Sequence, residues 1–527
     1  METLAELLAL PLMRCPDSTA ITGLDTRISF ARIEREARAV AATLIAKYRA
    51  RPGDRILVLA ENRPGIVPVA HGIWKAGCIY VPVDVKSPIL RLQHIIESIE
   101  PVVIIANGSL STELKTRFAA IPAVTFEQIQ AHGAAPDHIV LPAVSDQAPA
   151  MIIHTSGSTG VPKGVVLSHA SVVTYFRNHN EFLRFGIGSV GMNNAPFHFD
   201  VSIQDTFLPL YFGSSVLFHG GIFLSSLMID LIMKNRVTHL IAVSSVLDLI
   251  SRDLAKFSRL QSSSLSVVVT GGEVCAPGLI NRWLATVPGL RVLYGYGPTE
   301  CNSLCFTHEI RRPDHERITP YPIGLPFHGM KAVLFDEEGG IVTQPQRPGV
   351  LAISGPQVMR GYWRDPELTR KVSRSFEGDA YYVTGDYCVR DVQGVYSFVG
   401  RADSEVKIRG RRINLNEVRN ALMSQPGVSY VAVGTVESSG DTRIAAYVVA
   451  EHEGVTHRAL RDAAEERLLD YMRPHYIAMA TTAPRTGTGK TSEKLALDIL
   501  REAIAREPDK RDVHVPASAW ETAKAVA

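Results

Sequence analysis

The chain has 527 residues, of which 46% are hydrophobic and 20% are charged, and its formal net charge is +2. This length exceeds one ordinary hydrophobic core, so several packed subdomains are expected. A nearly neutral charge argues against nucleic-acid or membrane partners, and the six scattered cysteines argue against a disulfide framework. No stretch reaches the roughly 18 apolar residues of a membrane span, and residues 1–16 make a poor signal peptide, so a cytoplasmic protein is predicted.

Short apolar runs alternate with helical patterns over the first 330 residues. The runs are continuously apolar, which is typical of strands buried on both faces of an α/β sheet. Helices are expected at residues 1–16, Ile66–Ala76 and Ser225–Asn235. Strands are expected at Arg55–Leu59, Val102–Ile105, Ala150–Ile153, Leu240–Val243, Val267–Val269 and Val292–Tyr294.

Past about residue 330 the pattern becomes that of a β-rich subdomain, with strands expected at Lys331–Phe335 and Gly349–Ser354. A small α+β unit is expected after the polar junction at Gly400–Glu405. Its predicted helices are Leu415–Ser424 and His457–Leu469, and its predicted strands are Tyr430–Thr435 and Arg443–Val449. The predicted fold is therefore α/β, with a large N-terminal domain (1–400), a small α+β domain (401–510) and a loosely held tail (511–527).

The segment His154–Gly164 is rich in glycine and hydroxyl residues and follows a predicted strand. Such a loop can bring backbone N–H groups and hydroxyls close to phosphate oxygens, and a lysine adds a cation. The candidate phosphate-binding residues are Thr155, Ser156, Gly157, Ser158, Thr159, Gly160 and Lys163. The segment Thr488–Thr491 looks like the end of a Walker A loop, but Pro484 stands where that motif needs a glycine.

A second candidate motif, Tyr296–Glu300, follows the strand at Val292–Tyr294, at the sheet edge where open α/β folds bind ligands. Tyr296 offers a flat face for a purine, Thr299 can donate to a phosphate, and Glu300 is a hard oxygen ligand suited to Mg²⁺. Asp386 ends another short strand, and its carboxylate can accept two hydrogen bonds, which fits vicinal ribose hydroxyls.

These segments together resemble the motifs of adenylate-forming enzymes, the superfamily of acyl-CoA synthetases, luciferases and peptide-synthetase adenylation domains. The resemblance runs from about residue 25 to 500, in the family's order, and includes Gly361-Tyr362-Trp363. It implies ATP and Mg²⁺ as cofactors, with magnesium held by Glu300. The nucleotide-binding residues that it implies, beyond the phosphate loop, are Gly295, Tyr296, Asp386 and Arg401.

The same resemblance implies that Lys490 is catalytic together with Thr299 and Glu300. A lysine between the substrate carboxylate and the α-phosphate reduces the repulsion of two anions, a charge pair being worth roughly 4 kcal/mol at ~4 Å and an effective dielectric near 20. Asp403 matches the family's hinge position, so the resemblance implies a mobile C-terminal domain.

The segment Phe199–Ser202 resembles the motif of amino-acid-activating domains, whose aspartate, here Asp200, binds the substrate ammonium. A buried aspartate costs several kcal/mol unless a cation pairs with it, although an aspartate that caps a helix is the structural alternative. The pocket positions implied by the resemblance are Asp200, Val201, Gln204, Ile241, Val269, Gly271, Gly295, Ser303, Leu304 and Lys490. This neutral, mostly apolar lining, in which two glycines leave room, leaves open proline or another medium-sized neutral amino acid, including a β-amino acid.

The predicted function is a free-standing adenylation enzyme. It forms an aminoacyl-AMP from an amino acid and ATP, releases pyrophosphate, and loads the phosphopantetheine thiol of a separate carrier protein. A carrier in trans is expected because no Gly-Gly-x-Ser attachment motif follows the small domain. The alternatives are an acyl- or aryl-CoA ligase for a non-amino acid and a catalytically silent homologue, the latter disfavoured by Lys490, Glu300 and Asp386.

Overall fold

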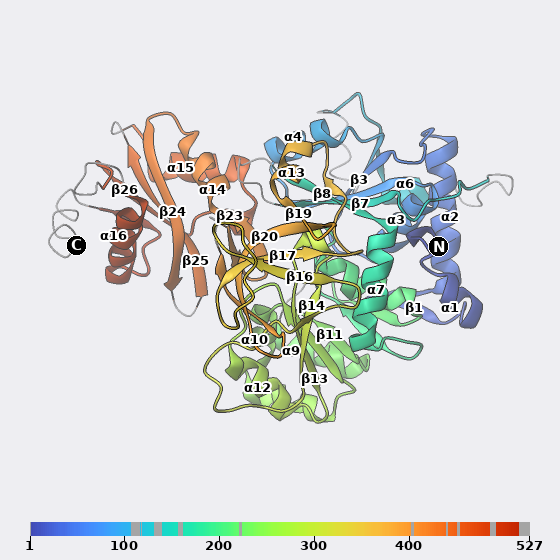
Figure 1. The fold of residues 1–527 in the computed structure, drawn as a ribbon. Coiled ribbons are helices and arrows are strands. Elements are labelled where there is room, and N and C mark those ends of the chain that lie inside the picture. Colours follow the sequence, from blue (N-terminus) through green and yellow to red (C-terminus); the bar gives the residue numbers. More distant parts are fainter. Residues whose placement is uncertain are drawn as a thin grey trace. The chain divides into compact units, whose positions relative to one another are not determined.

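The computed structural model describes residues 2–106, 116, 118–130, 140–155, 162–220, 224–401, 405–438, 441–450, 454–484 and 492–515. The chain divides into two compact units, whose elements are labelled in Figure 1. The first unit comprises Met1–Val85, Ile99–His154 and Gly164–Ala402. The second comprises Lys86–Ser98, Thr155–Lys163 and Asp403–Ala527.

A nine-stranded sheet in the first unit carries four of the ten predicted pocket positions, Ile241, Val269, Gly271 and Gly295. Its strand order is β15-β14-β13-β12-β11-β9-β10-β1-β2. Its strands β9, β11, β12 and β13 run parallel, so their carboxyl ends meet at one edge. The strands are β1 (Thr19–Thr22), β2 (Arg27–Ser29), β9 (Val190–Asn193), β10 (Ser215–Phe218), β11 (His239–Ile241), β12 (Val267–Gly271), β13 (Arg291–Tyr296), β14 (Phe306–Ile310) and β15 (Leu325–Pro326).

A seven-stranded sheet has the order β18-β8-β7-β4-β3-β5-β6. Its short edge strand β18 runs antiparallel to β8, which pairs Tyr362 with Val165. The glycine–tyrosine–tryptophan motif of the sequence therefore lies beside the strand that follows the predicted phosphate loop. The strands are β3 (Arg55–Leu59), β4 (Ile79–Val83), β5 (Val103–Ala106), β6 (Ala123–Thr125), β7 (Pro149–Thr155), β8 (Lys163–Ser168) and β18 (Gly361–Tyr362).

The helices of the first unit follow the predicted apolar patterns except at the N-terminus. A single helix was expected over residues 1–16, but the structure has two short ones, η1 (Leu4–Glu6) and α1 (Ala9–Arg14). Pro11 explains the break, because proline is tolerated only in the first turn of a helix. The other helices named below or in Figure 1 are α2 (Phe30–Ala46), α3 (Ile66–Lys75), α6 (Phe126–Gln130), α7 (His169–Leu183), α9 (Ser225–Lys234), α10 (Ser244–Ser251), α12 (Pro277–Thr286) and α13 (Pro366–Lys371).

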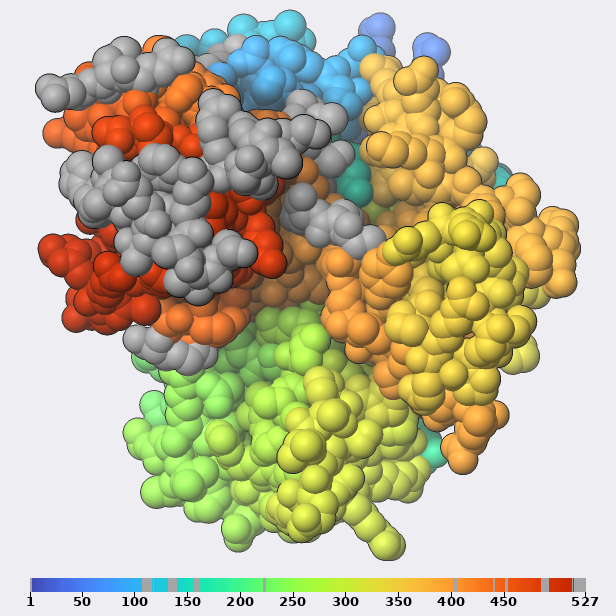
Figure 2. Space-filling view, turned by 60° about the vertical axis from the view of Figure 1, so that its left-hand side comes forward, coloured from blue at the N-terminus to red at the C-terminus, as the bar shows by residue number. Residues whose placement is uncertain are grey.

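The β-rich subdomain is a five-stranded sheet in which β21 pairs with β20, beside the order β16-β17-β20-β19. It is tied to the first sheet near Gly324, which bridges to Tyr396. Figure 2 shows the yellow and orange segments of this subdomain beside the green segments of the first sheet and its helices. The strands are β16 (Lys331–Phe335), β17 (Gly349–Ser354), β19 (Ser373–Phe376), β20 (Asp379–Arg390) and β21 (Tyr396–Arg401).

The second unit contains a two-stranded hairpin, β22-β23, and a four-stranded sheet of order β24-β25-β26-β27. One difference from the sequence prediction is β27, which lies within the predicted tail and pairs in parallel with β26. Its Val513 is buried, which explains why these residues join the sheet. The elements are α4 (Ile89–Ile99), β22 (Glu405–Ile408), β23 (Arg411–Asn414), α14 (Leu415–Met423), β24 (Val428–Ser438), β25 (Asp441–Ala450), α15 (His457–Arg467), β26 (Tyr476–Ala480), α16 (Glu493–Arg506) and β27 (Asp512–His514). Within the described ranges, no helix has both the length and the apolar character needed to cross a bilayer.

Candidate active site

The carboxyl edge of the nine-stranded sheet brings several predicted site residues together. Ile241 ends β11, Gly271 ends β12 and Tyr296 ends β13. The register places Gly271 directly opposite Gly295. Open α/β sheets bind ligands outside this edge, so the predicted pocket and purine positions lie where the topology favours a ligand.

Three predicted nucleotide-binding residues of the first unit form one buried polar cluster. Asp386 and Arg401 are cross-strand partners in the β20–β21 pair, and Arg401 Nη1 lies 2.6 Å from Asp386 Oδ1. The hydroxyl of Tyr296 donates to the other carboxylate oxygen of Asp386. Burial and the adjacent charge of Asp386 raise the pKa of Tyr296 well above its usual value, so this phenol stays protonated as a donor. Tyr296 therefore holds Asp386 in addition to the stacking role that its ring was predicted to have.

Glu300, the predicted magnesium ligand, lies in the short helix η4 (Thr299–Cys301) and is fully buried. The hydroxyl of Tyr362 donates to Glu300 Oε1 at 2.6 Å, and the N–H of Met359 donates to the Glu300 carbonyl at 2.7 Å. Thr299, at the start of the same helix, is partly buried. Sequence reasoning missed the role of Tyr362, although the motif that contains it was noted.

The segment before the predicted phosphate loop leaves a polar atom without a partner. Thr155 ends β7, and its hydroxyl oxygen is buried with no hydrogen-bond partner among the described residues. Buried hydroxyls are normally paired, so this oxygen fits a bound ligand. Lys163 begins β8, and a side chain at Gly164 would meet Ile152 at 2.7 Å. Five predicted phosphate-loop residues, the catalytic lysine and the hinge lie outside the described residues: Ser156, Gly157, Ser158, Thr159, Gly160, Lys490 and Asp403.

The substrate motif leads into an irregular helix. Asp200 and Val201 are partly buried at its start, and residues Ile203–Phe207 form a π-helical turn. Such turns are rare and frequently occur at functional sites. The turn contains the buried Gln204, whose Nε2 donates to Ser303 Oγ at 3.1 Å. Two predicted pocket positions that are far apart in sequence are thus in direct contact.

The fully buried aspartate of this region is Asp205, whereas the predicted ammonium ligand Asp200 is only partly buried. Asp205 Oδ2 accepts from the N–H groups of Asn194 (2.8 Å) and Ala195 (2.7 Å), and Oδ1 accepts from Asn193 (3.2 Å) and Thr206 (2.8 Å). The burial argument made for Asp200 therefore applies to Asp205, which fixes the loop after β9. Sequence reasoning missed this role, for which the only signal was a second carboxylate shortly after Asp200.

Asp205 makes stability depend on pH. Burial raises its pKa from 3.8 to about 6, so between these values the folded protein holds a proton that the unfolded chain releases. Asp205 therefore contributes to the unfolding free energy below about pH 4, and this contribution is lost as the pH rises through about 6. The unfolding free energy falls by on the order of 3 kcal/mol over this range. Asp205→Asn should flatten this part of the profile, measured as the thermal midpoint at pH 4.5 and 6.5. The exposed Asp230→Asn serves as control, and an unchanged profile in Asp205→Asn would contradict the assignment.

The loop that carries Ser303 and Leu304 has an unusual backbone. Asn302 and Ser303 have φ values of 58° and 72°, a left-handed conformation uncommon outside glycine. Gln357 stabilises the loop, because its carbonyl accepts from Asn302 Nδ2 at 2.6 Å and its Nε2 donates to the Leu304 carbonyl at 3.1 Å. Asn178 in turn donates to Gln357 Oε1 at 3.0 Å, which anchors the loop to α7.

Packing requires one of the two pocket glycines, Gly271, and leaves little space at the other, Gly295. A Cβ on Gly271 would lie 2.3 Å from the carbonyl oxygen of Gly295, and one on Gly295 would lie 2.6 Å from Leu304 Cδ1. The sequence interpretation gave room for the substrate as the reason for these glycines. The close approach of the β12 and β13 backbones is an independent reason for Gly271, whereas at Gly295 a shift of the Leu304 side chain could make room.

Comparison with known proteins identifies the family. The family model described as AMP-binding enzyme matches residues 11–363, and the model of its C-terminal domain matches residues 417–490. The chain belongs to the AMP-binding enzyme family. This AMP-binding enzyme is 30% identical to the L-proline–[L-prolyl-carrier protein] ligase of Streptomyces coelicolor over 91% of its own length and 93% of that protein. It is also 30% identical to the ligase of the same name from Pseudomonas fluorescens, over 96% of its own length and 99% of that protein.

Solved structures show the same fold at lower identity. Holo-PA1221, a nonribosomal peptide synthetase protein containing adenylation and PCP domains, has a TM-score of 0.82 at 23% identity over 94% of this AMP-binding enzyme and 84% of that chain. A double mutant of the o-succinylbenzoate CoA synthetase of Bacillus subtilis has a TM-score of 0.83 at 22% identity. The match covers 94% of this AMP-binding enzyme and 98% of that chain. The predicted fold class is confirmed. Because both kinds of enzyme share it, the fold alone does not separate the predicted function from its alternative.

Proposed function

We propose that this AMP-binding enzyme activates a neutral amino acid with ATP and transfers it to the phosphopantetheine thiol of a separate carrier protein. Full-length similarity to two carrier-protein ligases supports this activity over that of a CoA ligase. Those relatives are named for L-proline, which is therefore the first amino acid to test. The observation within the chain that supports the proposal most directly is the position of Asp200, at the start of the helix that contains Gln204.

The nucleotide is bound by the buried cluster that Tyr296 at the end of β13, Asp386 within β20 and Arg401 at the end of β21 form. Asp386 was expected to end a short strand, but β20 continues to Arg390 because it pairs with β21. Asp386 is held by Arg401 and Tyr296, so its carboxylate is fixed before ribose hydroxyls approach. Such preorganisation lowers the entropic cost of binding. By resemblance, Lys490 draws the substrate carboxylate and the α-phosphate together, and pyrophosphate leaves when the carboxylate attacks.

The chemistry of Glu300 fits the magnesium ion that the family implies. Mg²⁺ prefers oxygen ligands and is often bound by one or two carboxylates together with substrate phosphates. Glu300 supplies a buried carboxylate, and Tyr362 fixes its orientation. The described residues contain no group of three or more His, Cys, Asp or Glu side chains that could hold a metal. From its chemistry and its place after β13, we assign Glu300 as a protein ligand of this ion, which would neutralise phosphate charge when bound with the nucleotide.

The test of this function is amino-acid-dependent exchange between ATP and pyrophosphate, over the proteinogenic amino acids and a set of β-amino acids. We expect exchange with neutral amino acids, and at least a hundredfold lower kcat/KM for a matched acid without the amine, because a site that recognises a polar group of its substrate strongly rejects the analogue that lacks this group. Proline and cyclopentanecarboxylic acid form such a pair. Transfer is then measured as acylation of a phosphopantetheinylated carrier protein. Equal exchange with the two acids, together with CoA consumption, would establish the CoA-ligase alternative.

A further inference from the structure

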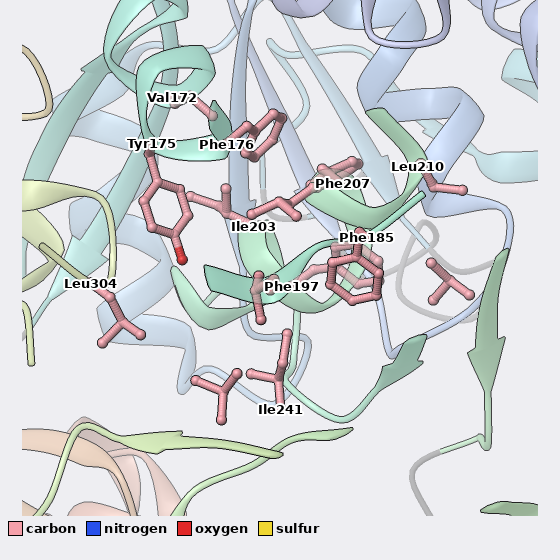
Figure 3. Packing of buried hydrophobic residues seen from close by; sticks show 14 of the residues in the cluster. Val172, Tyr175, Phe176, Phe185, Phe197, Ile203, Phe207, Leu210, Ile241 and Leu304 are labelled. Carbon is pink, nitrogen blue, oxygen red and sulfur yellow. The ribbon is translucent and has the colours of Figure 1, made fainter. Parts of the chain in front are cut away.

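Side-chain bridges join the loops that follow neighbouring strands at the carboxyl edge of the nine-stranded sheet. Asn194, in the loop after β9, donates from Nδ2 to the carbonyl oxygen of Ile241 at 2.9 Å, where β11 ends. The backbone N–H of Asn194 donates to Asp205 Oδ2 at 2.8 Å. Figure 3 shows Ile241 within the buried hydrophobic cluster of this region, which also contains Phe197 and Ile203. The end of β11 is therefore fixed from the side of β9.

Glu273 makes the corresponding bridge from the side of β12. It lies two residues after Gly271, the last residue of β12. Its Oε1 accepts from the hydroxyl of Ser244 at 2.5 Å and from the N–H of Ser245 at 3.2 Å. These two serines begin α10, the helix that follows β11. A carboxylate in the loop after one strand thus binds the start of the helix that follows the neighbouring strand.

The start of α10 has no cap from its own N-cap residue, which is the apolar Val243. The first N–H groups of a helix have no partner within the helix, and the positive end of the helix dipole favours a carboxylate there. Glu273 supplies the acceptor that Val243 lacks. Ala242, between Ile241 and Val243, donates its N–H to the Val269 carbonyl at 3.0 Å. The cap therefore continues the connection between β11 and β12 beyond the end of the sheet.

The loop that contains Glu273 is itself attached to the next strand. The hydroxyl of Tyr294, on β13, lies 3.4 Å from the Glu273 carbonyl, to which it donates, and 3.4 Å from the N–H of Cys275, from which it accepts. Burial raises the pKa of Tyr294 to about 12, so this hydroxyl stays protonated as a donor. Since β9, β11, β12 and β13 are successive neighbours in the sheet, the loops after them are joined in series. Glu273 is the side chain that links the loops after Ile241 and Gly271.

We propose, building on the function above, that Glu273 is a positioning residue that fixes the loops after Ile241 and Gly271 against each other and thereby sets the size of the amino-acid side chain that the enzyme accepts. Discrimination by one methylene is worth roughly 10- to 200-fold in kcat/KM and depends on a wall that does not move. Without Glu273 the loop after β11 loses its attachment to the loop after β12, so the wall can shift to admit a larger side chain. Glu273 acts through the backbone of these loops and is not itself a substrate ligand.

The experiment compares, in pyrophosphate exchange, the best amino acid with its homologue one methylene larger. In Glu273→Ala we expect the ratio of their kcat/KM values to fall at least about threefold, with the KM for ATP within about twofold of wild type. Glu273→Gln keeps an acceptor for both serine donors and should restore the ratio. An unchanged ratio in Glu273→Ala overturns the inference, while the proposed function stands. Absence of exchange with every amino acid in the wild type overturns the proposed function, and the inference with it.

Asp253→Ala is the matched control, because Asp253 caps α11 (Leu254–Phe257) by accepting from the N–H of Lys256 at 3.1 Å. Both variants remove a carboxylate cap from a helix of the first unit, so both should lower the thermal midpoint. Only Glu273→Ala should change the ratio, and equal changes in the two variants would show a merely structural role and overturn the assignment. If Glu273→Ala does not fold, Ser244→Ala removes one of the two donors and should lower the ratio at least about twofold. An unchanged ratio there would likewise overturn the inference.

Discussion

Asp200→Asn should lower kcat/KM for the amino acid in pyrophosphate exchange by about 10²- to 10³-fold. Asparagine keeps the shape of the side chain but removes the charge that we assign to the substrate ammonium. Asp200 is partly buried in the free protein, and a bound substrate would cover it. Removing one partner of a buried ion pair costs roughly 3–5 kcal/mol, and each 1.4 kcal/mol is a factor of ten. The measurement is a titration of the amino acid at saturating ATP.

The KM for ATP and the thermal midpoint of Asp200→Asn should stay close to wild type. Asp230→Asn is the matched control, because Asp230 is an exposed carboxylate paired with Arg259. The same loss of kcat/KM for an acid without an amine would show that Asp200 supports the fold of the pocket. A retained preference for amine-bearing substrates would contradict the assignment directly.

Asp386→Asn should raise the KM for ATP by about 10- to 100-fold and leave the KM for the amino acid nearly unchanged. The carboxylate is 1% exposed and is paired with Arg401 at 2.6 Å, so the substitution removes a charged acceptor and leaves a buried guanidinium without its counter-ion. Hydrogen bonds to charged groups contribute about 1.5–3 kcal/mol each.

Tyr296→Phe removes only the bond to Asp386 and should cost about 1 kcal/mol, which is near fivefold in the KM for ATP.

The control for these nucleotide-site variants is Asp379→Asn, on the same strand β20, where the carboxylate pairs with Lys331 at the surface. Exposed ion pairs are worth little, so its KM for ATP should not move. An unchanged KM for ATP in Asp386→Asn, with the protein folded, would remove Asp386 from the nucleotide site.

Much of the fold follows from local sequence patterns. The strands β3, β16 and β17 have the predicted bounds because each is an apolar run enclosed by turn residues. The prediction for β24 was shorter than its eleven residues, since its ends are extended by pairing with β25. Such pairing depends on a partner strand and leaves no clear local pattern.

The candidate site likewise contains residues that local motifs predict and contacts that only tertiary packing creates. The motifs around Tyr296 and Asp386 identified residues that the structure joins in one cluster. The contact between Tyr362 and Glu300, 62 residues apart and on different elements, could not be read from either motif alone. The buried network of Asp205 was likewise missed, because a polar residue in an apolar stretch does not reveal its partner. Tertiary packing supplies that information.

The left-handed backbone at Asn302 and Ser303 limits how this pocket can be redesigned. Strained backbone conformations cost on the order of 1–3 kcal/mol each and persist only where surrounding contacts hold them. Residues branched at Cβ are severe outliers in that region, so threonine, valine or isoleucine at position 303 would work against the turn itself. Libraries that aim to retarget the enzyme should therefore vary Val201 first, restrict Ile241 and Val269 to apolar residues because both are buried in the core, and treat position 303 as a backbone constraint. Replacing the whole loop together with Gln357, which anchors it, should preserve the backbone better than a single substitution at position 303.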